Sequence, residues 1–292
     1  MVSFFSPVSY SRVMASDDAD DQHRDKLRSA LEEGGADRVV ALIQGSAEPE
    51  LRRRLYTLAR HVLPDREKSD RRFDDVIRIA RAGIAEALRQ AELARGRSDA
   101  VDARECIDFA NKLSYNLSAD LADCWPGDLA PRERRHFEAG LRAAYDCVVW
   151  REELGKPPDR RAMAHWAAGM HQLSLGNVIE ALCAFEAAFG LALDGAAASA
   201  PDGGEDAKPE DYVKPNGDFG VSLYYGYAGI ARHLLGDEAG TRQLEQACAA
   251  FTATLQAPKD KEASDDAQFG LEQLRWVERK FSGAGAPVPA PR

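Results

Sequence analysis

The sequence predicts an all-α protein built from antiparallel helix pairs, and three observations lead to this fold class. Apolar residues recur with the spacing of a helix face along nearly the whole chain, while the alternation typical of strands is almost absent. Glycine and proline fall between the helical segments, where helices begin and end. Two hairpins, over residues 159–193 and 218–256, also share a Gly-x6-Gly spacing.

Start and stop residues place the helices in order along the chain. The Gly34-Gly35 pair ends the first helix, Pro64 ends the third, and Pro131 opens the sixth as a first-turn proline does. The stretch CWPGD, which contains Trp125, interrupts the helical pattern before it. The expected helices cover residues 17–33, 36–44, 47–63, 69–95, 99–124, 131–154, 159–175, 178–193, 218–235, 237–256 and 264–281.

Composition divides the chain into regions. We expect disordered tails over residues 1–16 and 283–292, and Met14 reads as well for a start as Met1 does. Between the tails, we expect an N-terminal helical region over 17–156 and a second helical region over 157–282. The second is interrupted at 195–217 by a segment rich in Ala, Gly, Pro and acidic residues, which we expect to be a mobile insertion.

Charge and hydropathy exclude several classes of partner. The 292 residues carry a formal net charge of −10, which disfavours binding to nucleic acid and to anionic membrane surfaces. Two basic runs, Arg52–Arg54 and Arg132–Arg135, lie beside acidic residues and are interpreted as solvated helix faces. No stretch approaches the roughly 18–20 apolar residues of a membrane span, and no secretory signal is evident, so a cytoplasmic location is expected.

The sequence contains no recognisable catalytic or metal-binding motif. The five cysteines form no CxxC pair and are interpreted as buried reduced thiols. Glu133-x-x-His136 has a spacing found in di-iron bundles, but the partner motif is missing, which favours a surface ion pair. HExxH, GxSxG, GxxxxGK[ST] and GxGxxG are all absent. We therefore expect neither enzymatic activity, nor a cofactor, nor a bound metal.

Small residues recur at matching positions of the two hairpins, and we expect them to let the paired helices approach closely. Gly169 should face Ala181 across the first hairpin, and Gly229 should face Gly240 across the second. The packing and turn positions expected from this pattern are Gly169, Gly176, Ala181, Phe185, Ala188, Gly229, Gly236 and Gly240.

These hairpins resemble the tetratricopeptide repeat (TPR), whose unit reads W-x2-L-G-x2-Y in the first helix and A-x3-F in the second. The matching stretches are His165-x2-Ala168-Gly169-x2-Gln172 with Ala181-x3-Phe185, and Tyr225-x2-Ala228-Gly229-x2-Arg232 with Gly240-x3-Leu244. His165, Gln172 and Arg232 depart from the pattern, and the resemblance covers about residues 159–256. It implies a TPR-like, right-handed α-solenoid; a generic helical bundle is the alternative.

In such a stack, the first helix of each hairpin lines a concave face that usually binds a protein segment. Here that face is apolar and lacks the basic and amide residues with which members of the family hold peptide carboxylates. Either it is an exposed groove, or the helix over 264–281, with Phe269, Leu274 and Trp276, covers it. The groove candidates are Met163, Trp166, Met170, Leu173, Leu223, Ile230 and His233.

Two functions follow from this sequence. The first is a non-enzymatic scaffold or adaptor that recognises a protein or peptide segment through the apolar concave face. The alternative is a helical sensor or enzyme domain that holds a small ligand in a pocket inside the superhelix. The residues that could line such a pocket are His165, Trp166, His171 and Tyr225.

Overall fold

A computed structural model describes residues 18–63, 72–199 and 209–283, and within these ranges the chain is helical and has no strand. The predicted all-α class is confirmed. Residues 1–16, most of the tail over 283–292, and the middle of the insertion over 195–217 lie outside the described residues. The helices are α1 (Asp18–Gln44), α2 (Pro49–Val62), α3 (Phe73–Gly96), α4 (Ala100–Leu121), α5 (Arg134–Glu153), α6 (Pro158–Ser174), α7 (Val178–Ser199), a short 3-10 helix (Pro209–Tyr212), α8 (Phe219–Leu234), α9 (Glu238–Gln256) and α10 (Lys261–Ser282).

Several helices differ from the boundaries expected from the sequence. Helix α5 begins at Arg134, so Pro131 lies before the helix and not in its first turn, where it was expected. The helices expected at 17–33 and 36–44 both lie within α1, separated by the non-helical backbone of Gly34 and Gly35, where Gly35 has a positive φ of 65°. Helix α7 continues to Ser199, past its expected end at 193, so the first residues of the expected insertion are helical. Three consecutive alanines follow Gly195, and their high helix propensity accounts for the extension.

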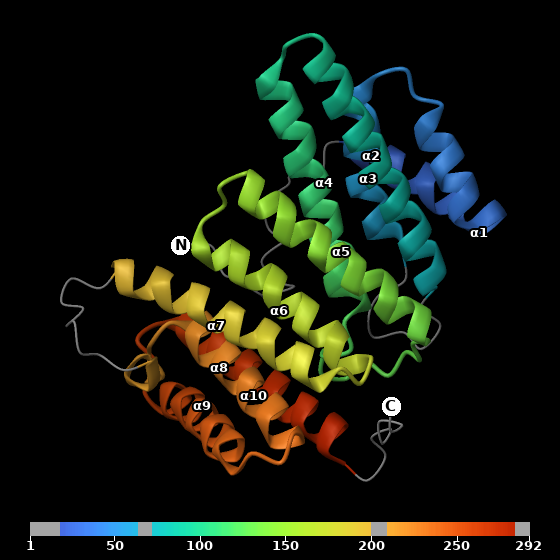
Figure 1. Cartoon of the computed structure of the whole chain (residues 1–292). Coiled ribbons are helices and arrows are strands. Elements are labelled where there is room, and N and C mark those ends of the chain that lie inside the picture. Colours follow the sequence, from blue (N-terminus) through green and yellow to red (C-terminus); the bar gives the residue numbers. More distant parts are fainter. Residues whose placement is uncertain (1–17, 64–71, 200–208, 284–292) are drawn as a thin grey trace. The chain divides into compact units, whose positions relative to one another are not determined.

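The chain forms two compact units. Among the described residues, the N-terminal unit contains 18–122 and 127–155, and thus α1 to α5. The C-terminal unit contains α6 to α10 together with the short segment 123–126, which comes between α4 and α5 in sequence. Within each unit, helices that follow one another along the chain pack side by side (Figure 1).

A glycine allows close packing at the centre of the N-terminal unit. The core there includes Leu27, Ile43 and Tyr56, all of them buried. A Cβ atom at Gly83 of α3 would lie 2.9 Å from Cγ of Tyr56 and 2.7 Å from Cδ1 of Leu113. Any larger residue at this position would therefore force α2 or α4 away from α3.

The predicted close approach of Gly229 and Gly240 is present in the C-terminal unit. A Cβ at Gly229 would lie 2.9 Å from the Gly240 carbonyl oxygen, so the backbones of α8 and α9 touch here. In the other hairpin, the nearest atoms to a Cβ at Gly169 belong to the ring of Phe185 rather than to Ala181. The ring reaches back across the interface, and it fills the space that the missing side chain leaves. Ala181, Phe185 and Ala188 are all completely buried.

The turns of both predicted hairpins have the same hydrogen-bond pattern. Gly176 and Gly236 adopt positive φ angles of 84° and 81°. In the first turn, the Gly176 N–H donates to the Leu173 carbonyl at 3.0 Å, and the Asn177 N–H donates to the Gln172 carbonyl at 2.9 Å. This pair of bonds is the Schellman motif that ends many helices, and the second turn repeats it.

A third hairpin, α3–α4, uses the same turn without a glycine. Ser98 occupies the position of Gly176 with a φ of 61°, its N–H donates to the Arg95 carbonyl, and the Asp99 N–H donates to the Ala94 carbonyl. The matching packing positions are again occupied by small or apolar residues that are buried: Ala91, Ala103, Ile107 and Ala110. Both of its helices were expected from the sequence, but its likeness to the other two hairpins was not, because Ala-x6-Ser replaces their Gly-x6-Gly spacing.

Candidate functional site

The apolar row expected as a concave groove is not open. Six of its seven residues are buried, and only His233 is exposed, where its Nδ1 lies 2.9 Å from the Thr241 hydroxyl. The interpretation as an exposed groove is therefore wrong, and the alternative, that the chain itself covers the row, holds. The buried residues are Met163, Trp166, Met170, Leu173, Leu223 and Ile230.

Aromatic rings and α10 fill this space. Trp166 lies between Trp125 and Tyr227, with ring centroids 6.1 and 6.2 Å away, and Phe269 of α10 lies 6.1 Å from Trp125. Leu274 of α10 is completely buried against Gly226 of α8. Helix α10 thus supplies part of the cover, as one interpretation expected. The ring of Trp125, which the sequence marks only as a helix break, supplies another part.

The residues expected to line an enclosed pocket pack against other side chains. Trp166 and His171 are completely buried. Tyr225 packs its ring on Phe189 at 5.2 Å, and its hydroxyl lies 3.3 Å from Oε1 of Gln246. Trp166 therefore belongs to the packed interior of the C-terminal unit rather than to the wall of an open cavity.

The N-terminal unit contains a pocket of about 440 Å³ between α2, the end of α3 and the start of α4. Four arginines contribute to its wall, and we call it the arginine pocket. The sequence alone does not point to this site, because its residues come from three helices. They are Glu48, Pro49, Glu50, Arg52, Arg53, Arg89, Gln90, Leu93, Arg97 and Asp102.

Glu86 lies behind this pocket and holds two of the arginines. Its carboxylate is 2.6 Å from Nε of Arg52 and 2.9 Å from Nη2 of Arg89, and it also accepts a hydrogen bond from Gln90. Burial by itself would raise the pKa of Glu86. Hydrogen bonds from Arg89, Gln90 and Arg52 outweigh that effect and lower the pKa to about 2. The carboxyl group of Glu86 is therefore ionised at neutral pH and hydrogen-bonded to Arg52, Arg89 and Gln90.

Arg53 lies deep in the pocket, with its side chain 17% exposed, and its carboxylate partner is more distant than those of the other three arginines. Its Nη1 donates to Oε1 of Gln90 and lies 3.2 Å from Sγ of Cys106, while Asp102 is 3.9 Å away. Asp102 is closer to Arg97, at 3.2 Å. The carboxylates of Glu86 and Asp102 thus pair with four guanidinium groups. Some N–H donors of Arg53 and Arg97 are therefore not used in these pairs.

The run Arg52–Arg54 is consequently not a solvated helix face. The side chains of Arg52 and Arg53 are only 11% and 17% exposed. Arg54 pairs with the buried carboxylate of Asp20 at 2.8 Å. The expectation was wrong because the compensating acids lie on α1, α3 and α4, not beside the arginines in sequence.

The second basic run also contains a buried charge. Arg132 is 1% exposed, pairs with Asp128 at 2.6 Å, and lies over the ring of Phe73 at 4.5 Å. His136 is buried and accepts a hydrogen bond at Nδ1 from the Glu133 N–H, at 3.0 Å, so this motif caps the start of α5. The motif Glu133-x-x-His136 therefore forms a helix cap, and the surface ion pair expected between its two residues is not present. The described residues contain no cluster of three potential metal ligands.

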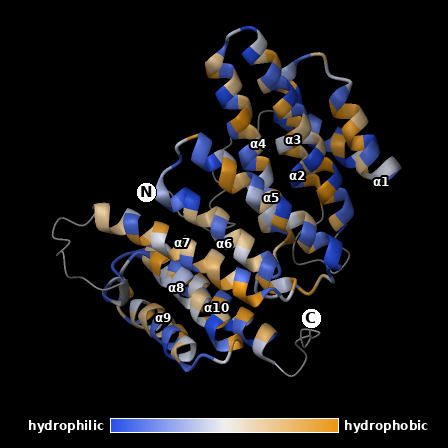
Figure 2. Ribbon diagram, in the orientation of Figure 1, coloured by the Kyte–Doolittle hydropathy of each residue, from blue (hydrophilic) through white to orange (hydrophobic). Residues whose placement is uncertain are grey.

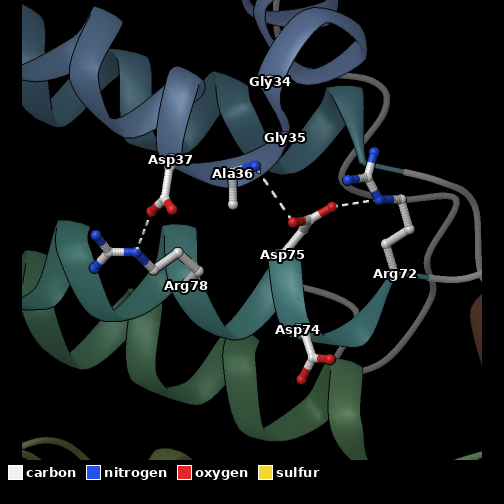
Figure 3. Close-up of a pocket in the computed structure, with 8 residues that line it drawn as sticks. All are labelled: Gly34, Gly35, Ala36, Asp37, Arg72, Asp74, Asp75 and Arg78. Carbon is white, nitrogen blue, oxygen red and sulfur yellow. Dashed lines mark hydrogen bonds and ion pairs between the residues drawn. The ribbon is translucent and has the colours of Figure 1, made fainter.

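A smaller pocket of about 370 Å³ surrounds the kink of α1 (Figure 3). Asp75 of α3 points to the kink, where it accepts a hydrogen bond from the Ala36 N–H at 3.3 Å and pairs with Arg72 at 2.5 Å. Arg78 pairs with Asp37 at 2.7 Å. The carboxylates and guanidinium groups thus pair with one another, and Asp75 also accepts a backbone hydrogen bond at the start of the helical segment after the kink. These contacts stabilise the kink.

Helix α7 is rich in apolar residues along its length (Figure 2). Ile179 is 63% exposed, Cys183 is exposed, and a Cβ at Gly190 would meet open space. We call these three residues, with Ala187 between them, the α7 outer face. The expectation that all five cysteines are buried is wrong for Cys183, because it lies on this outward side. The other four are buried.

By length and composition, Val178–Ala198 could cross a membrane, with a mean hydropathy of 1.4 over 18 residues. The expectation that no stretch approaches a membrane span is therefore wrong for this helix. Only 22% of this stretch is buried within the structure. On the α7 outer face, Ile179 and Cys183 are exposed, while Ala187 and Gly190 are half-buried.

Compared with models of protein families and with curated proteins, the sequence matches none. Function is therefore inferred from the geometry. Two features exceed what the fold itself requires: the α7 outer face in the C-terminal unit and the arginine pocket in the N-terminal unit.

Proposed function

We propose that this protein is a non-enzymatic interaction scaffold that binds a helical segment of another protein on the α7 outer face. The observation that carries this proposal is the combination of high hydropathy and low burial in α7. Exposed apolar residues on an otherwise packed helix are typical of a surface that contacts a partner. In α7 one side packs within the unit through Ala181, Phe185 and Ala188, and the other side is available.

We further propose that the hairpins form a TPR-like, right-handed solenoid. Each helix of the C-terminal unit packs against the next one along the chain, as a solenoid requires. The hairpins α3–α4, α6–α7 and α8–α9 share one type of turn, which supports a repeated unit. In such a stack the second helix of a hairpin turns its outer side away from the concave face, which suits a docking role for α7.

The charge of α7 indicates the kind of partner. The helix has three acidic residues, Glu180, Glu186 and Asp194, and no lysine or arginine. All three are exposed, and Glu186 pairs with Arg232 at 2.5 Å. A second copy of α7 would bring carboxylates against carboxylates. An amphipathic helix with an apolar stripe and flanking basic residues complements both the apolar face and its charge.

The test is binding of a synthetic peptide measured by fluorescence anisotropy. The probe is a leucine–lysine peptide with leucines at helical i, i+3, i+4 spacing, compared with a scrambled peptide of the same composition and a leucine–glutamate peptide. Ile179→Glu should weaken binding of the first peptide at least about tenfold, because it places a charge in the apolar contact. The matched control is Val149→Glu on α5, where the native valine is 62% exposed.

Three results would overturn this proposal. They are equal binding of the scrambled peptide, undiminished binding by Ile179→Glu, and preferential binding of the wild-type protein to phosphatidylcholine vesicles over the peptide. Self-association that is lost in Ile179→Glu would assign the face to a second copy instead.

A further inference from the structure

We propose that the arginine pocket binds the phosphate group of a small organic phosphate. This inference concerns the N-terminal unit and does not depend on the α7 outer face. It rests on hydrogen-bond donors that the fold leaves unused, on the balance of charge around them, and on an apolar wall beside them.

The donors come from Arg53 and Arg97. Arg53 uses only Nη1, and Arg97 only Nη2, in hydrogen bonds or ion pairs to other described residues. The Nε–H and Nη2–H groups of Arg53 form a planar fork, which matches two oxygens of a phosphate, and Arg97 adds the N–H groups of its Nε and Nη1. Arg53 is held in place by Gln90, which is itself buried and bonded to Glu86 and to the Pro49 carbonyl. Its fork is thus preorganised rather than free to move.

The positive and negative charges around the pocket balance, so an anion would be bound through direct hydrogen bonds rather than through a net positive charge. Four arginines are balanced by Glu86 and Asp102 at the base and by Glu48 and Glu50, both exposed at the rim. The two inner carboxylates each serve two arginines, whereas neither rim glutamate has an ion-pair partner among the described residues. An anion that reaches Arg53 therefore gains direct hydrogen bonds and meets some repulsion from Glu48 and Glu50.

An organic rather than an inorganic ligand is indicated by the rest of the wall. Leu93 is 51% exposed and lines the pocket together with Pro49. A volume of about 440 Å³ is larger than one phosphate requires and lies in the range of small-molecule sites. A phosphate carries close to two negative charges at neutral pH, which suits two partly unused guanidiniums better than a single carboxylate does.

The experiment is isothermal titration calorimetry of the full chain with three probes: inorganic phosphate, phenyl phosphate and benzoate. We expect phenyl phosphate to bind at a 1:1 ratio and more tightly than either of the others. Arg53→Gln and Arg97→Gln should each weaken that binding at least about tenfold, because each removes a charge-assisted hydrogen bond. Glu50→Gln should strengthen it, because it removes repulsion at the rim.

The matched control is Arg95→Gln, which alters an exposed arginine of α3 that pairs with Glu92 and Glu153 outside the pocket. It should leave binding unchanged. Arg97 is 61% exposed, so its variant tests the pocket even if Arg53→Gln does not fold. The proposal is overturned if phenyl phosphate gives no saturable heat, if Arg97→Gln binds it like the wild type, or if benzoate binds equally well.

Discussion

The indole of Trp166 in α6 and the ring of Tyr227 in α8 meet edge to face, with centroids 6.2 Å apart and planes at 61°. Phe185 of α7 also stacks on Tyr227, at 5.1 Å. Three rings thus join the two predicted hairpins at the centre of the C-terminal unit. Such ring pairs stabilise a core beyond the area that they bury.

Replacement of Trp166 by alanine should cost about 3 to 5 kcal/mol of unfolding free energy, because it leaves a large cavity among rings that cannot close in. Urea denaturation followed by circular dichroism measures this loss. Trp166→Phe should cost less, since it retains one ring. An unchanged urea midpoint for the alanine variant would show that the row does not hold the unit together.

Gly169→Ala should destabilise the protein by about 1 to 3 kcal/mol, because the new methyl group would lie 2.6 Å from Cδ1 of Phe185. Gly190→Ala on α7 is the matched control. There the new methyl meets open space, and alanine should stabilise the helix by up to about 1 kcal/mol. Thermal melts of the two variants should therefore shift in opposite directions, and shifts of the same sign would contradict the packing role of Gly169.

Ser98→Gly should stabilise the N-terminal unit by a few tenths to about 1 kcal/mol. Ser98 adopts a φ of 61°, a conformation that costs a residue with a side chain more than it costs glycine. Gly176→Ala and Gly236→Ala should destabilise the protein for the converse reason. The measurement is the urea midpoint of each variant. Destabilisation by Ser98→Gly would mean that the serine side chain contributes more than its backbone strain costs.

The charge on Glu86 should make the stability of the N-terminal unit depend on pH. Its folded-state pKa of about 2 lies below the ordinary value of 4.5. Its contribution, about 3 kcal/mol, is therefore present above pH 4.5 and is lost as the pH falls from 4.5 through 2.

Urea titrations at several pH values test this effect. Glu86→Gln should be less stable than the wild type at pH 7, and its stability should change less between pH 5 and pH 3. A variant with the same pH dependence as the wild type would show that other carboxylates dominate acid unfolding.

The sequence by itself determined the helical class and the geometry of the two predicted turns. These features depend on local physics: apolar periodicity defines a helix face, and glycine tolerates the positive φ that a Schellman turn requires. The contact between Gly229 and Gly240 could be predicted for the same reason, since both lie in one hairpin. The turn at Ser98 escaped prediction because a strained residue occupies the glycine position.

Only the tertiary structure decided which surfaces are covered. Whether Trp166 lines an open groove depends on Trp125 and α10, which approach from distant parts of the sequence. Whether Arg52 is solvated depends on Glu86, which is 34 residues away and on another helix. Burial and charge compensation are sums over all neighbours in space, and a local pattern holds no information about neighbours that the fold brings from elsewhere.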